Sequence, residues 1–463
     1  MRFENTVGRL LFFLVLCFGA VMAAAVYWAV MGPETILNEP VNYRLRDAAG
    51  TLIRGAIADR DGRLMVLSVP GEDGFVTRRA AEPAIHSLTG YSSIQYGVGG
   101  AEAAFDSILR NAGTADAIGD TIRYNLLHLP QRGSDIRLTV SLDVQRAAAD
   151  ALNGLGQPGG IVVMDAVSGE LLALASAPTV NPETLDAQWA ELIADPGHPF
   201  VNRATQGRYT AGSALSPALL AAWLIDGRDV NDELPRDAVA SCPDMGGFTV
   251  REAFTRHCIP AFDAMAETLG PAKIDALIEL FGMNTPVTLP GFTLATSAAP
   301  TETPPPSVEQ TSSGFESVTR SPLELAVMTA AIANGGNAPQ PVILQAIRPP
   351  EAQEWTPVEG GGQLMAVTTA QTASTIANAM RTSAANGLSH SDVCIGTDIG
   401  SIVGMSADED GQQAFFLGFA QLIDGYTVIV SMAVENADLS QAAAIADAGN
   451  GVLCAALASH AEG

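Results

Sequence analysis

A run of 22 uncharged apolar residues lies close to the N-terminus, from Leu10 to Met31. As a helix this run would measure about 33 Å, which is long enough to cross a bilayer. Arg2 and Arg9 precede the run, whereas acidic residues follow it, so the basic flank is expected to stay in the cytoplasm. The sequence therefore predicts a single-pass protein of the cytoplasmic membrane whose large C-terminal part is extracytoplasmic.

A cleaved signal peptide is the alternative interpretation of this run. The small residues Ala23, Ala24 and Ala25 resemble a cleavage region. However, the apolar run continues for six residues beyond them, which is longer than a typical signal core. Tyr27 and Trp28 also suit the membrane interface. These features favour an uncleaved anchor.

The charge of the chain restricts its partners. Its 463 residues carry a formal net charge of −26, which would repel nucleic acid, so none is expected as a partner. Of the 24 basic residues, 23 are arginine, and the single lysine, Lys273, is expected to be a solvated charge on a helix surface. No cysteine or histidine spacing indicates a metal site, and no cofactor is predicted.

Four cysteines lie in the part predicted to be outside, where disulfides persist. Pairing of Cys242 with Cys258, or of Cys394 with Cys454, is open, because spacing does not fix the connectivity.

Periodicity and turn residues predict both strands and helices beyond the anchor. Asp61-Gly62 marks a hairpin turn, and Ser321-Pro322 opens a helix that ends before Asn334. The other expected helices are 101–110, 142–150 and 439–458, and the expected strands are 161–165, 170–176, 401–407, 414–422 and 426–435. This order predicts an α+β fold with helices packed on an antiparallel sheet.

Three stretches carry a family resemblance. They are RGAIADRDG at 54–62, NRATQGRYTAGS at 202–213 and VEN at 434–436. Together they resemble the class B penicillin-binding proteins, the peptidoglycan D,D-transpeptidases. The resemblance implies a transpeptidase domain of the penicillin-binding-protein and serine β-lactamase type, with an antiparallel sheet and helices on both faces. The implied order is a cytoplasmic tail (1–9), a transmembrane anchor (10–31), a small β-rich juxtamembrane domain (32–135) and the transpeptidase-like domain (136–463).

The first catalytic motif of that family, SxxK, aligns with Ser213 to Ser216. The resemblance makes Ser213 the nucleophile, but Ser216 stands where a lysine should take the serine proton. Since a hydroxyl is a negligible base near pH 7, this loss alone is expected to cost on the order of 10²–10⁴-fold in rate. The alternative interpretation of Ser213 is helix capping, because Pro217 and an apolar run follow it.

The other two motifs are also changed. At the SxN motif, His257 stands for the serine and Ile259 for the asparagine, and isoleucine can neither donate nor accept a hydrogen bond. At the KTG motif, Met405, Ser406 and Ala407 stand for lysine, threonine and glycine. Met405 removes the cation that would meet a substrate carboxylate, and Ala407 adds a methyl group where a ligand must approach closely.

The sequence therefore predicts a membrane-anchored family member of peptidoglycan synthesis and cell division that is catalytically inactive and acts as a scaffold or regulator. The expected partners are membrane proteins of the wall-synthesis machinery, such as a polytopic glycosyltransferase, and binding of the peptidoglycan stem peptide is not predicted. One alternative is a residually active acyl-serine enzyme in which His257 is the base for Ser213. A simpler interpretation makes His257 a polar residue at a helix end, near a carbonyl. The other alternative is a sensor that binds a muropeptide or β-lactam without turnover.

Overall fold

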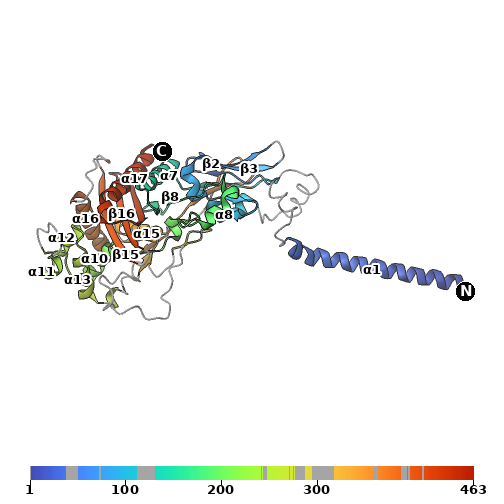
Figure 1. Cartoon of the computed structure of the whole chain (residues 1–463), viewed down its shortest axis with the longest axis horizontal. Helices are drawn as coiled ribbons and strands as arrows, with labels where there is room; N and C mark the ends of the chain where they lie inside the picture. Colours follow the sequence, from blue (N-terminus) through green and yellow to red (C-terminus); the bar gives the residue numbers. More distant parts are fainter. Residues whose placement is uncertain are drawn as a thin grey trace.

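The structure, a computed structural model, separates a long N-terminal helix from a folded part that holds the two larger sheets (Figure 1). It describes residues 2–37, 51–71, 75–111, 131–240, 242, 248–270, 272–274, 276, 287–294, 318–358, 360, 363–386, 394, 397–408 and 411–462.

The N-terminal helix α1 extends over Arg2–Leu37, a length of about 54 Å. The side chains from Gly8 to Ala24 are exposed, and large apolar ones such as Phe12 and Phe18 are about 70% exposed. Such a surface needs an apolar surrounding that the folded part does not supply.

A second helix is also apolar. Among the described residues, Leu439–Ala461 is the helix whose length and composition suffice to cross a membrane, and half of that stretch is buried. It comprises η5 (Leu439–Gln441) and most of α17 (Ala442–Glu462), which packs on a sheet. Its apolar character is therefore that of a core helix.

An antiparallel sheet of five strands forms the centre of the folded part, in the order β15-β16-β17-β7-β8. The predicted hairpin consists of β7 (Gly159–Asp165) and β8 (Leu171–Ala177). The predicted meander consists of β15 (Asp398–Asp408), β16 (Gly411–Gln421) and β17 (Thr427–Glu435). Both predictions are confirmed. Among the described strands, β15 pairs only with β16 and forms an edge of the sheet.

Helices cover both faces of this sheet, as predicted (Figure 1). On one face, α7 (Leu142–Leu155) and α17 pack against Phe416 and its neighbours. On the other face, α15 (Pro322–Ala333) lies against β17 and β7. It begins at the predicted residue because Ser321 and Glu324 form a capping box.

A second sheet has six strands in the order β13-β12-β6-β1-β2-β3. The predicted turn at Asp61-Gly62 joins β1 to β2, which pair antiparallel. Three of the strands, β6, β12 and β13, come from further along the chain and complete the sheet that the N-terminal strands begin. The bounds are β1 (Ile57–Ala58), β2 (Leu64–Pro70), β3 (Val76–Ala80), β6 (Asp135–Leu138), β12 (Leu344–Arg348) and β13 (Thr356–Pro357).

The helix predicted over 101–110 is two short helices that break at Phe105, namely α4 (Ala101–Ala104) and α5 (Asp106–Leu109). The remaining elements are short or lie around the candidate site. They are η1 (Pro83–Ile85), α3 (His86–Thr89), β4 (Ser92–Ser93), β5 (Gly97–Val98), α8 (Leu185–Ala194), α9 (Arg203–Gln206), β9 (Tyr209–Thr210), η3 (Gly212–Leu215), α10 (Ser216–Ile225), α11 (Arg236–Val239), α12 (Val250–Thr255), α13 (Ile259–Leu269), β10 (Thr319–Arg320), β11 (Asn337–Pro339), β14 (Leu364–Ala366) and α16 (Ala370–Asn386).

Two disulfides join the four cysteines of the folded part. Cys242 pairs with Cys258, and Cys394 pairs with Cys454, with Cα atoms 5.6 and 5.5 Å apart. Both pairings that the spacing left open are therefore present. Lys273 forms an ion pair with Asp226 and is half exposed, as expected of a surface charge.

Candidate active site

A pocket of about 320 Å³ lies between the edge strand β15 and the start of α10. It brings together residues at the positions of all three catalytic motifs, SxxK, SxN and KTG. Its lining residues are Thr210, Gly212, Ser213, Ser216, Leu219, Ile259, Phe262, Asp263, Met405, Ser406, Ala407, Gln412 and Leu439.

Ser213 lies on η3, which packs directly against the edge of β15. A Cβ atom on Gly404 would lie 2.6 Å from the backbone of Ala214, and one on Gly212 would lie 2.6 Å from the carbonyl oxygen of Met405. Only glycine permits so close an approach of the two backbones.

The hydroxyl of Ser213 is held by the backbone of Met405. The Met405 N–H donates to Ser213 Oγ at 2.8 Å, and Ser213 Oγ lies 3.0 Å from the Met405 carbonyl oxygen. Ser213 is 7% exposed, and neither η3 nor α10 has a side-chain cap at its N-terminus. The helix-capping interpretation of Ser213 is therefore wrong: its hydroxyl bonds to a strand edge.

His257 is the second partner of Ser213, with 3.0 Å between His257 Nε2 and Ser213 Oγ. The residue follows α12 in a left-handed conformation (φ 54°) and precedes Cys258, which is tied to Cys242. The predicted proximity of His257 and Ser213 is thus confirmed. His257 lies at a helix end, but its Nε2 faces the serine hydroxyl, so the interpretation of a contact with a carbonyl alone is wrong.

Burial lowers the pKa of His257 to about 4, so the imidazole is neutral at pH 7. Its other nitrogen, Nδ1, is buried and has no hydrogen-bond partner among the described residues. Within the described part of the chain, no carboxylate therefore orients this ring. The ring packs edge-on against Phe262, with 5.4 Å between centroids.

The single proton of the Ser213 hydroxyl has two acceptors within reach, His257 Nε2 and the Met405 carbonyl oxygen. If the Ser213 hydroxyl donates to His257 Nε2, it takes part in two hydrogen bonds, because Oγ also accepts from the Met405 N–H. If it donates to the Met405 carbonyl instead, Oγ can accept from both the Met405 N–H and the His257 Nε2–H, since a hydroxyl oxygen accepts two hydrogen bonds. The hydroxyl then takes part in three hydrogen bonds. The second arrangement satisfies more groups. In it, His257 is a donor to Ser213 and not a base.

Ser216, which stands for the lysine of the first motif, is 2% exposed, and its Oγ has no partner in the described part. Ile259 is the first residue of α13 and is 39% exposed at the pocket. Ser406 donates to Gln413 Oε1 at 2.8 Å, so its hydroxyl is turned to the neighbouring strand. Ala407 is exposed near the end of β15.

The described lining of this pocket lacks the positive charge expected of a site that binds a substrate carboxylate. Among the described residues that line it, Asp263 is the only ionisable side chain, and there is no lysine or arginine. An anionic ligand would therefore lose its hydration without gaining a cation.

One partly buried contact near the site was not predicted. Arg203 Nε donates to Glu435 Oε1 at 2.7 Å, and the Tyr209 hydroxyl donates to the same oxygen at 2.9 Å. Burial and the nearby Glu435 carboxylate raise the pKa of Tyr209. The two stretches that resemble the family, 202–213 and 434–436, are thus in contact, and these hydrogen bonds join the segment before Ser213 to strand β17.

Comparisons with known proteins agree with this architecture. Residues 159–452 match the family model of the penicillin binding protein transpeptidase domain. The peptidoglycan D,D-transpeptidase PbpA of Mycolicibacterium smegmatis is 28% identical over 358 residues, which cover 71% of this chain and 72% of the relative. PbpA of Mycobacterium tuberculosis is 26% identical over 366 residues, covering 73% and 74%.

Solved structures give the same result. The penicillin G acyl-enzyme complex of penicillin-binding protein A from M. tuberculosis superimposes with a TM-score of 0.76 at 25% identity, covering 88% of this chain and all of the other. The D,D-transpeptidase domain from Eggerthella lenta gives 0.73 at 25% identity, covering 89% and 99%. This chain belongs to the penicillin-binding-protein transpeptidase family, with class B peptidoglycan D,D-transpeptidases among its relatives.

Proposed function

We propose that this chain is a membrane-anchored, non-catalytic member of the family that serves peptidoglycan synthesis and cell division as a scaffold or regulator. One observation carries the proposal: the only titratable side chain within hydrogen-bond distance of Ser213 Oγ, among the described residues, is a neutral histidine whose pKa is lowered to about 4. Efficient general-base catalysis needs a pKa near the working pH.

The surroundings of the pocket support the same proposal. The family chemistry needs a base at position 216 and a cation at position 405, and serine and methionine occupy them. The sheet, the helices and the Arg203–Glu435 link, by contrast, are intact. A chain that keeps its scaffold while losing its charged groups is suited to bind proteins and not to turn over a substrate.

The partners would meet the chain at the membrane and outside it. The exposed apolar surface of α1 suits a bilayer or the helices of a polytopic membrane protein. With Arg2 and Arg9 in the cytoplasm, the six-stranded sheet and the pocket lie outside. A glycosyltransferase of the wall-synthesis complex is the proposed class of partner.

The test is a substitution in cells of the source organism. Ser213→Ala is compared with the matched change Ser374→Ala, on an exposed face of α16, and with deletion of the chain. We expect both substituted strains to grow and divide like the parent, at equal protein levels, whereas the deletion strain shows a wall or division defect. A Ser213→Ala strain that reproduces the deletion defect would refute the non-catalytic proposal.

A second candidate function is favoured by the 3.0 Å contact between Ser213 and His257. Residual acyl transfer through this pair would split a thioester slowly. Because the pKa of His257 is about 4, the rate should be level from pH 8 to pH 5 and should fall below that. Activity that disappears in both Ser213→Ala and His257→Asn would support this candidate, and activity that survives His257→Asn would exclude it.

A further inference from the structure

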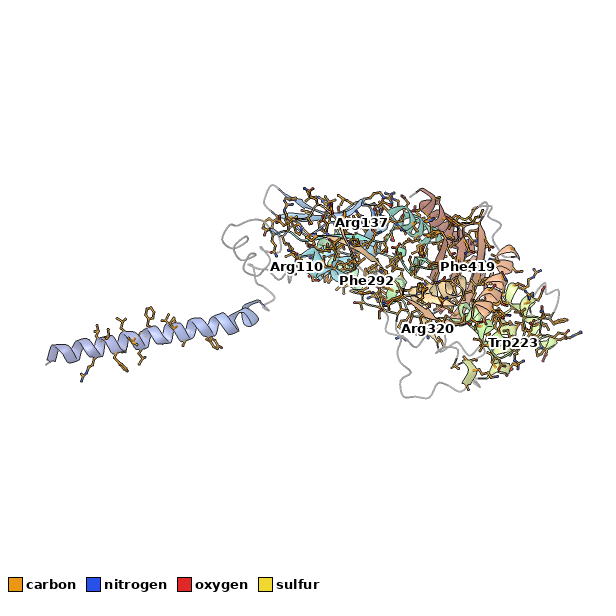
Figure 2. All side chains as sticks on the ribbon, turned by 180° about the vertical axis from the view of Figure 1, so that it is seen from behind. Arg110, Arg137, Trp223, Phe292, Arg320 and Phe419 are labelled. Atoms are coloured by element: carbon orange, nitrogen blue, oxygen red, sulfur yellow. A yellow bond between two sulfur atoms is a disulfide. The ribbon has the colours of Figure 1, made fainter. Side chains whose placement is uncertain are left out.

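A second pocket, of about 230 Å³, lies where the helices and loops around 86–103 meet the end of β8, the segment 199–206 and the short stretch 291–293. It shares no lining residue with the pocket at Ser213. In Figure 2, Phe292, which lines the second pocket, lies nearer the N-terminal strands than does Trp223 of α10, the helix whose first residue, Ser216, lines the pocket at Ser213.

Two nearly buried polar side chains line this pocket without using their hydrogen-bonding groups. Thr205 is 1% exposed and His86 is 9% exposed, and neither side chain has a hydrogen-bond partner within the described part of the chain. The amide nitrogen of Gln206 is similarly unused, although its Oε1 accepts from the Asn202 N–H. These polar groups face the pocket and make no hydrogen bond within the described part of the chain, so they are available to pair with a ligand.

The described residues that line this pocket include no acidic residue, lysine or arginine. Burial lowers the pKa of His86, which favours the neutral imidazole at pH 7, with one donor and one acceptor. An anionic or cationic ligand would therefore find no counter-charge on the walls. The chemistry of the pocket selects an uncharged ligand with several hydrogen-bonding groups.

Aromatic rings form the apolar part of the walls. Tyr91, Phe200 and Phe292 line the pocket. Behind them, Trp189 packs 5.1 Å from Phe200 and is stacked on Tyr96, with 4.0 Å between centroids. These contacts fix the orientation of the lining rings. The faces of aromatic rings are electron-rich, so they attract the weakly positive C–H groups of a sugar ring.

We propose that this pocket binds one neutral N-acetylated sugar ring of a glycan chain. A sugar ring presents C–H faces to Tyr91 and Phe200 and hydroxyl and amide groups to Thr205 and His86, which is the combination that these walls offer. A peptide ending in a carboxylate would lack a cation here. The proposal does not depend on whether Ser213 reacts, because the two pockets have no residue in common.

The test uses the full chain in detergent and the β-1,4-linked tetramer of N-acetylglucosamine as the probe, with binding measured by calorimetry. Thr205→Val keeps the shape of the side chain and removes only the unpaired hydroxyl. The matched control is Thr382→Val, on an exposed face of α16. We expect the parent and the control to bind equally and Thr205→Val to bind about tenfold more weakly, the loss of one ligand hydrogen bond.

Stability gives an independent readout. Because the Thr205 hydroxyl has no hydrogen-bond partner among the described residues, Thr205→Val should unfold at the same urea concentration as the parent or at a higher one. Weaker binding together with equal or greater stability supports a ligand-binding role. No binding by the parent at millimolar probe, or equal binding by Thr205→Val, would overturn the proposal. Displacement of the probe by a D-alanyl-D-alanine peptide would also overturn it, by making the pocket a peptide site.

Discussion

His257 gives the site its strongest dependence on pH. Its pKa is about 4 in the folded protein and about 6.5 when unfolded, so below pH 6.5 the unfolded chain binds the proton more tightly. The stability that neutral His257 provides is therefore complete above about pH 6.5 and is lost as the pH falls toward 4.

At the scale of the residue, we expect the stability of the parent to depend more strongly on pH than that of His257→Asn. Asparagine tolerates the left-handed backbone of this position and does not titrate. Between pH 7.5 and pH 5, the parent should lose about 2 kcal/mol of unfolding free energy relative to the variant, and urea unfolding at both values measures it. Equal losses in the two proteins would mean that His257 is not buried as described.

The motif residues show how far the sequence predicts a site. The positions of Ser213, Ser216, Ile259 and Met405 around one pocket followed from their order in the chain and the resemblance. The link between Arg203 and Glu435 did not, because two charges 232 residues apart leave no local pattern. The capture of the Ser213 hydroxyl by the strand backbone was also unpredicted, since backbone groups carry no sequence signal.

At the scale of elements, local patterns sufficed for the hairpin and the meander of the central sheet. They did not suffice for the pairing of β17 with β7 that joins the two, or for the six-stranded sheet. The hairpin β7–β8 and the meander β15–β17 pair neighbours in sequence, and alternation and turn residues predict such pairs. Strand β6, in contrast, pairs parallel with β1 and antiparallel with β12, about 80 and 210 residues away. Short strands joined over such separations give no local signal of their register.

The contact between η3 and β15 supplies a prediction at this scale. Gly404→Ala should destabilise the protein by about 1–3 kcal/mol, because its Cβ would meet the backbone of Ala214 at 2.6 Å. The control is Gly154→Ala in α7. There the added Cβ would meet no atom within 4 Å outside the backbone of its own helix, and the change should stabilise by about 0.5–1 kcal/mol. Urea unfolding of both variants tests this, and a neutral Gly404→Ala would contradict the tight packing.

For the whole molecule, the predicted orientation rests on helix α1 as the proposed membrane anchor. Alkaline phosphatase fused after Gly463 should be active, because helix α1 would deliver it outside the cytoplasm. The same fusion without residues 2–37 should be inactive at an equal protein level. An inactive full-length fusion would contradict the orientation, and recovery of a mature chain that begins after Ala25 would contradict the uncleaved anchor.

The central claim concerns Ser213, and acylation tests it most directly. The full chain in detergent is incubated with benzylpenicillin beside its Ser213→Ala variant, and intact mass is recorded for both. Penicillin-binding protein A from M. tuberculosis, which forms a penicillin G acyl-enzyme, is the positive control. Because His257 has a lowered pKa and the described residues that line the pocket include no lysine, we expect no stoichiometric mass gain on either protein. A stoichiometric gain on the parent that is absent from Ser213→Ala would contradict the account.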